Sequence, residues 1–319
     1  MAGVACLFLA TPAGAREPLL RTSAGKLNAA LHCQAAVRHA KREPVLLVHG
    51  TGGGGSDEWV SPVDFRKSMS DAGYPVCYVE LPDHALADAQ ISAEYVVNAI
   101  RRTRTMAGRP IALYGHSQGG LLARWALTYW PSLRSQVADV VSVAGTQHGT
   151  NGAAAASLLE PLCRHPGCPP TFWQQRIGSN LEKALNNGRD ETPGPTAWTT
   201  VRTTGDDVVQ PQTGAHPTSA LRGASNILIQ RVCRGRSTNH IKAAYDSVSF
   251  AALLDALRHR GPAVPSRFSR KVCSHPYAPG LSRLRVEALN AGALPTILAR
   301  ILAYPPVRRE PALRGYAKS

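Results

Sequence analysis

Short apolar runs alternate along the chain with stretches whose apolar positions recur at helical spacing. The runs that have the length and composition of buried strands occupy residues 44–48, 74–81, 109–114, 137–144, 199–204 and 226–232. Helical stretches are predicted over residues 63–72, 92–104, 121–127, 153–159, 174–185 and 281–304. Strands that alternate with helices are typical of a mostly parallel sheet covered on both faces. We therefore predict an α/β fold in a single domain.

Residues 151–190 lie in a region that breaks this alternation. The region is rich in Ala, Pro, Gly and Asn and carries two of the helical pieces. In parallel sheets, sites form beyond the carboxyl ends of the strands. An insertion that covers such a site would have this composition, so we expect a lid or pocket wall here.

The charge balance is strongly basic, with 36 Lys and Arg against 21 Asp and Glu and a formal net charge of +15. Such an excess occurs in proteins that bind nucleic acid or anionic membranes. The arginines are scattered and no nucleic-acid recognition motif accompanies them, so we expect a basic, solvated surface and no nucleic-acid partner. Attraction to anionic lipid surfaces stays open.

The first fifteen residues, MAGVACLFLATPAGA, are apolar and end in a small-x-small pattern typical of a signal-peptidase site. No Lys or Arg precedes the apolar run, which departs from the usual signal-peptide pattern. The run is too short to span a bilayer, and we expect no other transmembrane segment. The sequence thus predicts a secreted protein whose mature domain covers residues 16–319.

The cysteines support an oxidising compartment. Removal of residues 1–15 takes away Cys6 and leaves six cysteines, an even number that permits fifteen pairings. Cys163 and Cys168 enclose Arg-His-Pro-Gly, a turn sequence, and we predict that these two pair. The other pairings stay open on spacing alone. No CxxC or His-x-x-x-His spacing favours a metal site, and we expect neither metal nor cofactor.

A serine bracketed by glycines is the strongest chemical signal in the chain. Residues 114–120 read YGHSQGG, and they lie between a predicted strand and a predicted helix. A serine on a very tight strand-to-helix turn needs neighbours without side chains where the chain doubles back. Ser117 is therefore predicted to be a nucleophile on such a turn, whereas the alternative is an ordinary turn serine.

A serine nucleophile needs a base to take its proton and an acid to orient the base. In the hydrolase plan these follow in the order Ser, acid, His, each after a strand. Asp206 and His240 meet that order. Asp207 is the rival acid, and His148 also follows a strand but precedes any acid.

The loop after the first central strand, residues 49–55, reads HGTGGGG. Negative charge develops on the ester oxygen during attack, so two N–H donors should face it. We expect these from the backbones of Thr51 and Gln118, with the Thr51 hydroxyl as a further donor. The alternative, phosphate binding, lacks the Gly-Lys-Ser/Thr ending of a P-loop and the context of a dinucleotide fold.

These residues resemble the α/β-hydrolase lipases typified by Candida antarctica lipase B and its bacterial relatives. The likeness runs from about residue 44 to 273 and is carried by PVLLVHGTG (44–52), EYVVNAI (94–100), SQGGLLARWALTYWPSLRSQV (117–137), WQQRIGSNLEKAL (173–185) and DDVVQPQ (206–212). It implies an α/β-hydrolase fold. It also places the nucleophile, acid, base and oxyanion donors on the residues named above. Its disulfides would correspond to Cys33 with Cys77 and Cys233 with Cys273.

Two positions depart from the fungal pattern. A tryptophan of the alcohol-binding pocket stands there where this chain has His116, and an acid stands where it has Thr146. The C-terminal cysteine pair of the fungal enzyme has no counterpart after Cys273. We therefore expect an altered substrate pocket, with further apolar contacts from the predicted lid at Leu158, Leu159, Phe172 and Trp173. The alternative is that these four side chains are simply core.

The pattern as a whole favours a monomeric serine carboxylester hydrolase that acts on acylglycerols or other lipid esters, and such esters are met at a lipid–water interface. An acyltransferase or a polyesterase would use the same triad. A non-catalytic protein that binds lipid or a surface through its basic face is the alternative from a different class. The complete set of five groups in order argues against it.

Overall fold

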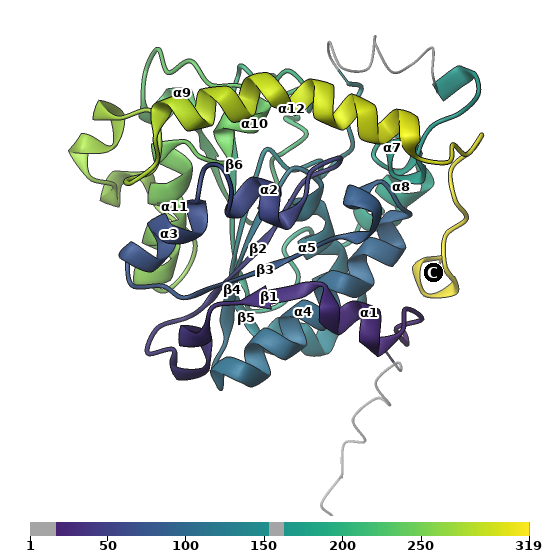
Figure 1. Ribbon diagram of the computed structural model, residues 1–319, viewed down its shortest axis with the longest axis horizontal. Coiled ribbons are helices and arrows are strands. Elements are labelled where there is room, and N and C mark those ends of the chain that lie inside the picture. Colours follow the sequence, from purple (N-terminus) through teal and green to yellow (C-terminus); the bar gives the residue numbers. More distant parts are fainter. Residues whose placement is uncertain (1–16, 153–162, 319) are drawn as a thin grey trace, which may run out of the picture.

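The computed structural model describes residues 17–152 and 163–318. A seven-stranded sheet lies at its centre in the order β1-β3-β2-β4-β5-β6-β7 (Figure 1). The strands are β1 Leu31–Cys33, β2 Val45–Val48, β3 Val76–Val79, β4 Ile111–His116, β5 Val137–Val143, β6 Ala197–Arg202 and β7 Ser225–Leu228. The edge strand β1 pairs antiparallel with β3, whereas the other neighbours pair in parallel. The mostly parallel sheet predicted from the sequence is confirmed.

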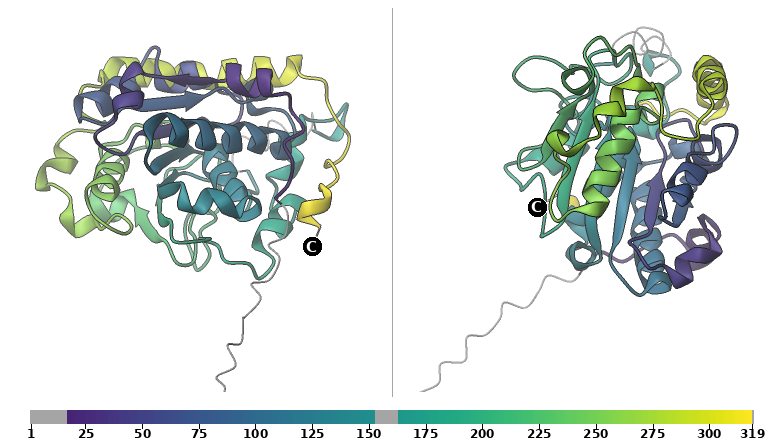
Figure 2. Two further views of the ribbon diagram at one scale, coloured as in Figure 1. Left: turned by 90° about the horizontal axis from the view of Figure 1, so that it is seen from below. Right: turned by 90° about the vertical axis from the view of Figure 1, so that its left-hand side faces the viewer.

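The helices cover both faces of this sheet (Figure 2). They are α1 Ala24–Ala29, α2 Gly55–Trp59, α3 Phe65–Asp71, α4 Ala89–Ala107, α5 Gln118–Tyr129, α7 Pro170–Gln174, α8 Asn180–Asn186, α9 Ile229–Val232, α10 His240–Ala243, α11 Ser247–Arg258 and α12 Arg283–Ala303. Because successive side chains of a strand point to opposite faces, β2 sends Leu46 and Val48 into the core under α4 and α5. Val45 and Leu47 enter the core under α3 and α11. The continuous apolar runs therefore fill two cores.

Some predicted boundaries were wrong. Residues 226–232 form strand only to Leu228, and the chain then turns into the short helix α9. The helix predicted over 174–185 begins only at Asn180, because Gly178 takes a positive φ and Ser179 caps α8 through the N–H of Glu182, whereas α7 ends at Gln174. α4 begins at Ala89 with Asp88 as its cap, one turn before the predicted Ser92. The predictions for residues 1–15 and 153–159 lie outside the described residues.

The long C-terminal helix α12 crosses the carboxyl edge of the sheet, as its place in Figure 1 shows. By length and composition alone α12 could cross a membrane, and only 11% of its apolar window is buried. The expectation that no stretch would qualify as transmembrane is therefore wrong for this helix by that measure. Leu284, Leu294 and Leu302 on α12 are all more than half exposed.

The segment after α12 returns along the molecule and docks on α4, α5 and α8. The Glu310 carboxylate accepts from the backbone N–H groups of Asn180 and Leu181, which caps α8. Arg314 pairs with the buried Glu94 of α4. Tyr316 stacks edge-on against Trp125 and other rings of α5. The chain that follows α12 is thus held against the rest of the molecule.

Three disulfides are present in the described residues: Cys33–Cys77, Cys163–Cys168 and Cys233–Cys273. The first joins the edge strand β1 to β3, and the last ties the end of α9 to the segment before α12. These are the pairs that the turn sequence and the resemblance predict. Disulfides persist in oxidising compartments.

Glycines explain how the turn at Ser117 fits beneath the sheet edge. A Cβ at Gly115 would lie 2.6 Å from the backbone of Gly119, and one at Gly119 would collide with the carbonyl of Val48. Ser117 itself takes φ 54° and ψ −123°, a conformation that non-glycine residues rarely adopt. The crossing of β2 and α5 therefore leaves no room for side chains here.

We expect Gly119→Ala to lower the free energy of unfolding by about 3 kcal/mol or more, because the backbone of β2 must move to admit the methyl group. Gly25→Ala in α1 is the matched control, since nothing lies within 4 Å of its added carbon. That control should be neutral or slightly stabilising. Urea unfolding followed by circular dichroism measures both, and equal midpoints for the two variants would contradict the steric argument.

Candidate active site

The three predicted catalytic side chains come from loops at the carboxyl edge of the sheet. Ser117 follows β4 directly, Asp206 follows β6, and His240 opens α10. Ser117 and His240 both line one cavity of about 510 Å³, within the size range of small-molecule sites. Ser117 is 5% exposed, so its hydroxyl lies in a largely covered position.

Asp206 and His240 form a buried pair. The Nδ1 of His240 lies 3.0 Å from both carboxylate oxygens of Asp206. The same carboxylate accepts the backbone N–H groups of Val208 and Val209, which fixes its orientation. Nδ1 therefore donates to Asp206, which leaves Nε2 as the nitrogen that can accept a proton.

The neighbouring Asp207 contacts the loop that carries His240, but not the His240 ring. Its carboxylate accepts from the backbone N–H of His240 at 3.2 Å and from the amide of Asn239 at 3.3 Å. The rival histidine, His148, faces Thr218 and Glu191 and does not line the cavity. The geometry thus favours Asp206 and His240 over both alternatives.

The charge environment tunes His240. Burial by itself lowers its pKa, but the charge and hydrogen bond of Asp206, with smaller effects of Asp207 and Glu58, raise it above the ordinary value of 6.5. A raised pKa means that the imidazolium form is stabilised in this setting.

The glycine-rich loop lies beside Ser117, since a Cβ at Gly50 would stand 2.9 Å from the Ser117 Cβ. Thr51 donates its hydroxyl proton to the side-chain oxygen of Gln118 at 2.8 Å and accepts from Gln175 at 2.9 Å. Gln175 in turn accepts from the hydroxyl of Thr146 at 2.8 Å. A continuous chain of polar contacts therefore holds the loop against the start of α5. As the first residue of α5, Gln118 has no intrahelical acceptor for its backbone N–H.

The remaining predicted pocket residues divide. His116, Thr146 and Phe172 line the cavity. Trp173 does not, because its indole N–H donates to the carbonyl of Val307 and its ring stacks under Arg176. Leu158 and Leu159 lie outside the described residues.

Most of the apolar wall was missed by sequence reasoning, because it comes from α12. Five side chains of this helix line the cavity: Leu294, Ile297, Leu298, Ile301 and Leu302. Arg300 holds the helix in place by bonds to the Gly52 carbonyl and the Asp57 carboxylate, both at 2.8 Å. The helical spacing was visible in the sequence, but nothing in it indicated that the helix crosses the site.

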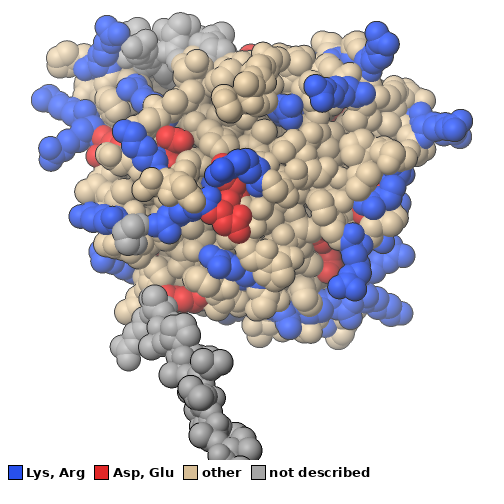
Figure 3. Space-filling model, turned by 180° about the vertical axis from the view of Figure 1, so that it is seen from behind, with Lys and Arg blue, Asp and Glu red and all other residues tan. Residues whose placement is uncertain are grey.

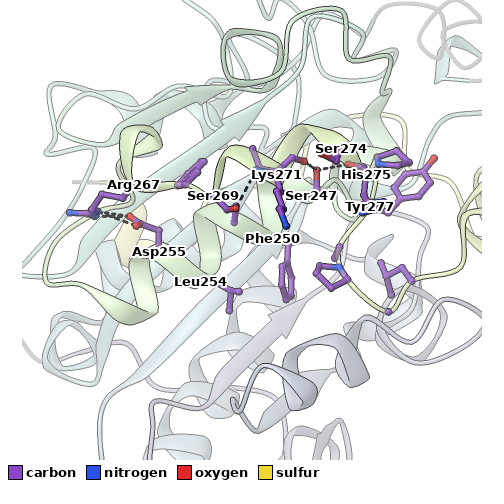
Figure 4. A pocket seen from close by; sticks show the side chains of 18 of the residues that line it. Ser247, Phe250, Leu254, Asp255, Arg267, Ser269, Lys271, Ser274, His275 and Tyr277 are labelled. Atoms are coloured by element: carbon purple, nitrogen blue, oxygen red, sulfur yellow. Dashed lines mark hydrogen bonds and ion pairs between the residues drawn. The ribbon is translucent and has the colours of Figure 1, made fainter.

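The described residues form two further cavities, one next to the Ser117 cavity and one separate from it. One of about 260 Å³ adjoins the first, sharing Glu58, His116, Ile241 and Ile297 with it. A larger groove of about 810 Å³ lies between α11 and residues 265–283 and shares no lining residue with the Ser117 cavity. Figure 4 shows its apolar floor at Phe250 and Leu254 and the Arg267–Asp255 ion pair at one end. This groove is separate from the candidate site.

Comparison with known proteins identifies the family. Lipase B of Pseudozyma antarctica is 32% identical over 313 residues, which cover 96% of this chain and 88% of that protein. The chain belongs to the lipase B family. The crystal structure of Aspergillus fumigatus lipase B superposes with a TM-score of 0.83 at 31% identity, covering 99% of this chain and 76% of that one. The chain is therefore an α/β-hydrolase of the lipase/esterase type.

Two shorter similarities agree with this assignment. The triacylglycerol lipase of Pseudomonas fragi is 32% identical over 148 residues, 45% of this chain and 44% of that protein. The family model described as palmitoyl protein thioesterase matches residues 44–187. The residues matched by the family model include the turn at Ser117.

The two acids after β6 are separable by experiment. We expect Asp206→Asn to lower kcat on a soluble ester by about 10⁴, because the amide no longer holds the base in its tautomer. Asp207→Asn should cost less than about tenfold, since its carboxylate contacts the His240 backbone N–H and the Asn239 side chain but not the His240 ring. In the wild type, kcat/KM should fall as the pH drops through the raised pKa of His240, because the protonated ring cannot act as a base. Comparable losses in both variants would refute the assignment.

Proposed function

We propose that this lipase B relative is a secreted serine carboxylester hydrolase that cleaves acylglycerols or other lipid esters through an acyl-enzyme. The observation that supports this most is the placement of Ser117 on the strained turn, in one cavity with His240, whose Nδ1 is held by Asp206. A binding protein has no use for a strained serine beside a carboxylate-held imidazole.

In the proposed reaction, Ser117 Oγ attacks the ester carbonyl while His240 Nε2 takes its proton. The backbone N–H groups of Thr51 and Gln118 receive the developing negative charge on the carbonyl oxygen. The imidazolium then protonates the leaving alcohol, and Asp206 stabilises its charge throughout. Water, activated by His240, attacks the acyl-enzyme and releases the fatty acid.

The hydroxyl of Thr51 would join the oxyanion donors after one small rearrangement. It now donates to the Gln118 carboxamide oxygen, while the Nε2 of that amide is buried without a partner. A half-turn of the carboxamide would let Nε2 donate to Thr51 and free the hydroxyl proton for the substrate. The Gln175 contact would persist, because a hydroxyl oxygen accepts two hydrogen bonds.

The substrate class follows from the lining. The α12 leucines and isoleucines form an apolar wall suited to an acyl chain, whereas Thr51, Thr146 and Gln175 supply a polar side. Leu294 and Leu302 of α12 line this cavity and are also more than half exposed, which suits contact with a lipid–water interface. Figure 3 shows Lys and Arg scattered over the opposite face instead of gathered in one patch. An acyltransferase or a polyesterase would use the same catalytic groups. We further propose that the protein is a monomer.

The decisive test is hydrolysis of p-nitrophenyl esters from butyrate to palmitate, and of emulsified triglyceride, by residues 16–319 and its Ser117→Ala variant. Turnover by the wild type with a loss on the order of 10⁶ in the variant is expected for loss of the nucleophile. The chain-length profile then separates a lipase from a short-chain esterase. A folded wild type inert on every ester would remove the hydrolase proposal in favour of lipid binding.

Interfacial contact of α12 has its own test. Leu294→Ser with Leu302→Ser removes about 1.5–3 kcal/mol per side chain that would otherwise be buried in lipid. We expect the rate on emulsified triglyceride to fall about tenfold more than the rate on soluble butyrate ester. Leu19→Ser, at a still more exposed leucine outside α12, should leave the ratio of the two rates unchanged. A proportional loss on both substrates would limit α12 to a pocket wall.

A further inference from the structure

Glu58, on the short helix α2, carries a carboxylate next to the candidate site. The proposed reaction gives this carboxylate no role. Its side chain is 13% exposed. One oxygen, Oε1, accepts the backbone N–H of Gly50 at 3.0 Å, directly before the predicted oxyanion donor Thr51. The other, Oε2, lies 3.1 Å from Nδ1 of His116, the residue before Ser117. Glu58 therefore joins the oxyanion loop to the nucleophile turn.

His116 carries the connection further. Its Nε2 lies 3.1 Å from the main-chain carbonyl of His240, and its ring centroid is 4.9 Å from the His240 ring. The side chain is 2% exposed, so water does not replace these contacts. One imidazole thus links the nucleophile turn to the loop of the base.

The partners of Glu58 and His116 indicate which atoms of the pair donate and which accept. A main-chain carbonyl only accepts, so Nε2 of His116 must donate to it. Burial raises the pKa of Glu58, but the charge and hydrogen bond of His116 outweigh it, with help from His49 and the Gly50 N–H, and lower the pKa. Glu58 is therefore ionised and accepts from Nδ1. Both ring nitrogens of His116 thus face acceptors, Oε2 of Glu58 and the main-chain carbonyl of His240.

We propose that Glu58 and His116 form a buried hydrogen-bonded pair that positions the three catalytic loops relative to one another. This inference rests on the proposed function, because the pair positions the groups that the proposed reaction uses. Gly50, Ser117 and His240 belong to loops after different strands, and the pair contacts all three loops. Charge-assisted hydrogen bonds in a covered site are stronger than neutral ones and define geometry more tightly. Tyr245 fixes the pair itself by donating to the Glu58 main-chain carbonyl at 3.0 Å.

A small misplacement of reacting groups costs up to about 10² in rate, so loss of the pair should be visible in kinetics. We expect Glu58→Ala to lower kcat about 30-fold, with KM within about twofold. Glu58→Gln should restore kcat to within about threefold of wild type. Its amide oxygen can still accept from Gly50, and its NH₂ can donate to a neutral His116 that keeps its bond to His240.

Glu80→Gln is the matched control. This carboxylate accepts from the N–H groups of Gly55 and Ser56 at 2.7 Å, at the other end of the same loop, without reaching His116. It should leave kcat within about twofold, because α2 keeps a side-chain acceptor at its start. Thermal midpoints of all variants are recorded, since a merely structural role would lower stability without the rescue by glutamine.

The readout that separates this inference from the proposed function is the rate at which a fluorophosphonate labels Ser117, which needs no particular ester. A wild type that is labelled rapidly but hydrolyses no ester would contradict the proposed substrate class. The positioning role of Glu58 would still be tested by the labelling rates of the variants. An unchanged labelling rate in folded Glu58→Ala, or a Glu58→Gln as slow as Glu58→Ala, overturns the positioning role. If Glu58→Ala does not fold, His116→Phe, which removes both donors, decides by the same rate and is expected to label about 30-fold more slowly.

Discussion

The close approach of α5 to the end of β2 is the constraint on which the rest of the site depends. Because Gly115 and Gly119 carry no side chains, α5 can start directly against the Val48 carbonyl. That approach forces Ser117 into its positive φ and presents it beside the glycine-rich loop. Ser117 and the glycine-rich loop are neighbours because β2 and β4 are adjacent parallel strands. The strain is sustained by two cores that fix both strands.

The sequence predicted this central part well because its signals are local. An apolar run followed by a glycine-bracketed serine and a helix former specifies a strand, a turn and a helix with little help from elsewhere. The choice between Asp206 and Asp207 was less certain, since adjacent residues share the same sequence context. Only the backbone path after β6 turns one carboxylate to the ring of His240 and the other to its N–H.

What the sequence left unpredicted depends on packing between distant segments. Glu58 stands in a loop with several polar residues, and its contact with His116 exists because α2 folds back over the nucleophile turn. The wall from α12 likewise depends on Arg300 reaching Gly52 and Asp57, about 240 residues earlier in the chain. Trp173 was placed in the pocket on its apolar character, but its indole N–H finds an acceptor in the C-terminal segment.

The C-terminal segment gives α12 a mechanical property that differs from that of a hinged flap. Before the helix, Cys233–Cys273 ties the chain to α9. After it, Val307 exchanges two backbone hydrogen bonds with Cys168, and Glu310 and Arg314 anchor the chain to α8 and α4. A helix fastened beyond both ends behaves as a strap, whose displacement requires the release of anchors on opposite sides of the molecule. The width of the apolar side of the cavity is therefore set by anchors that lie far from the cavity itself.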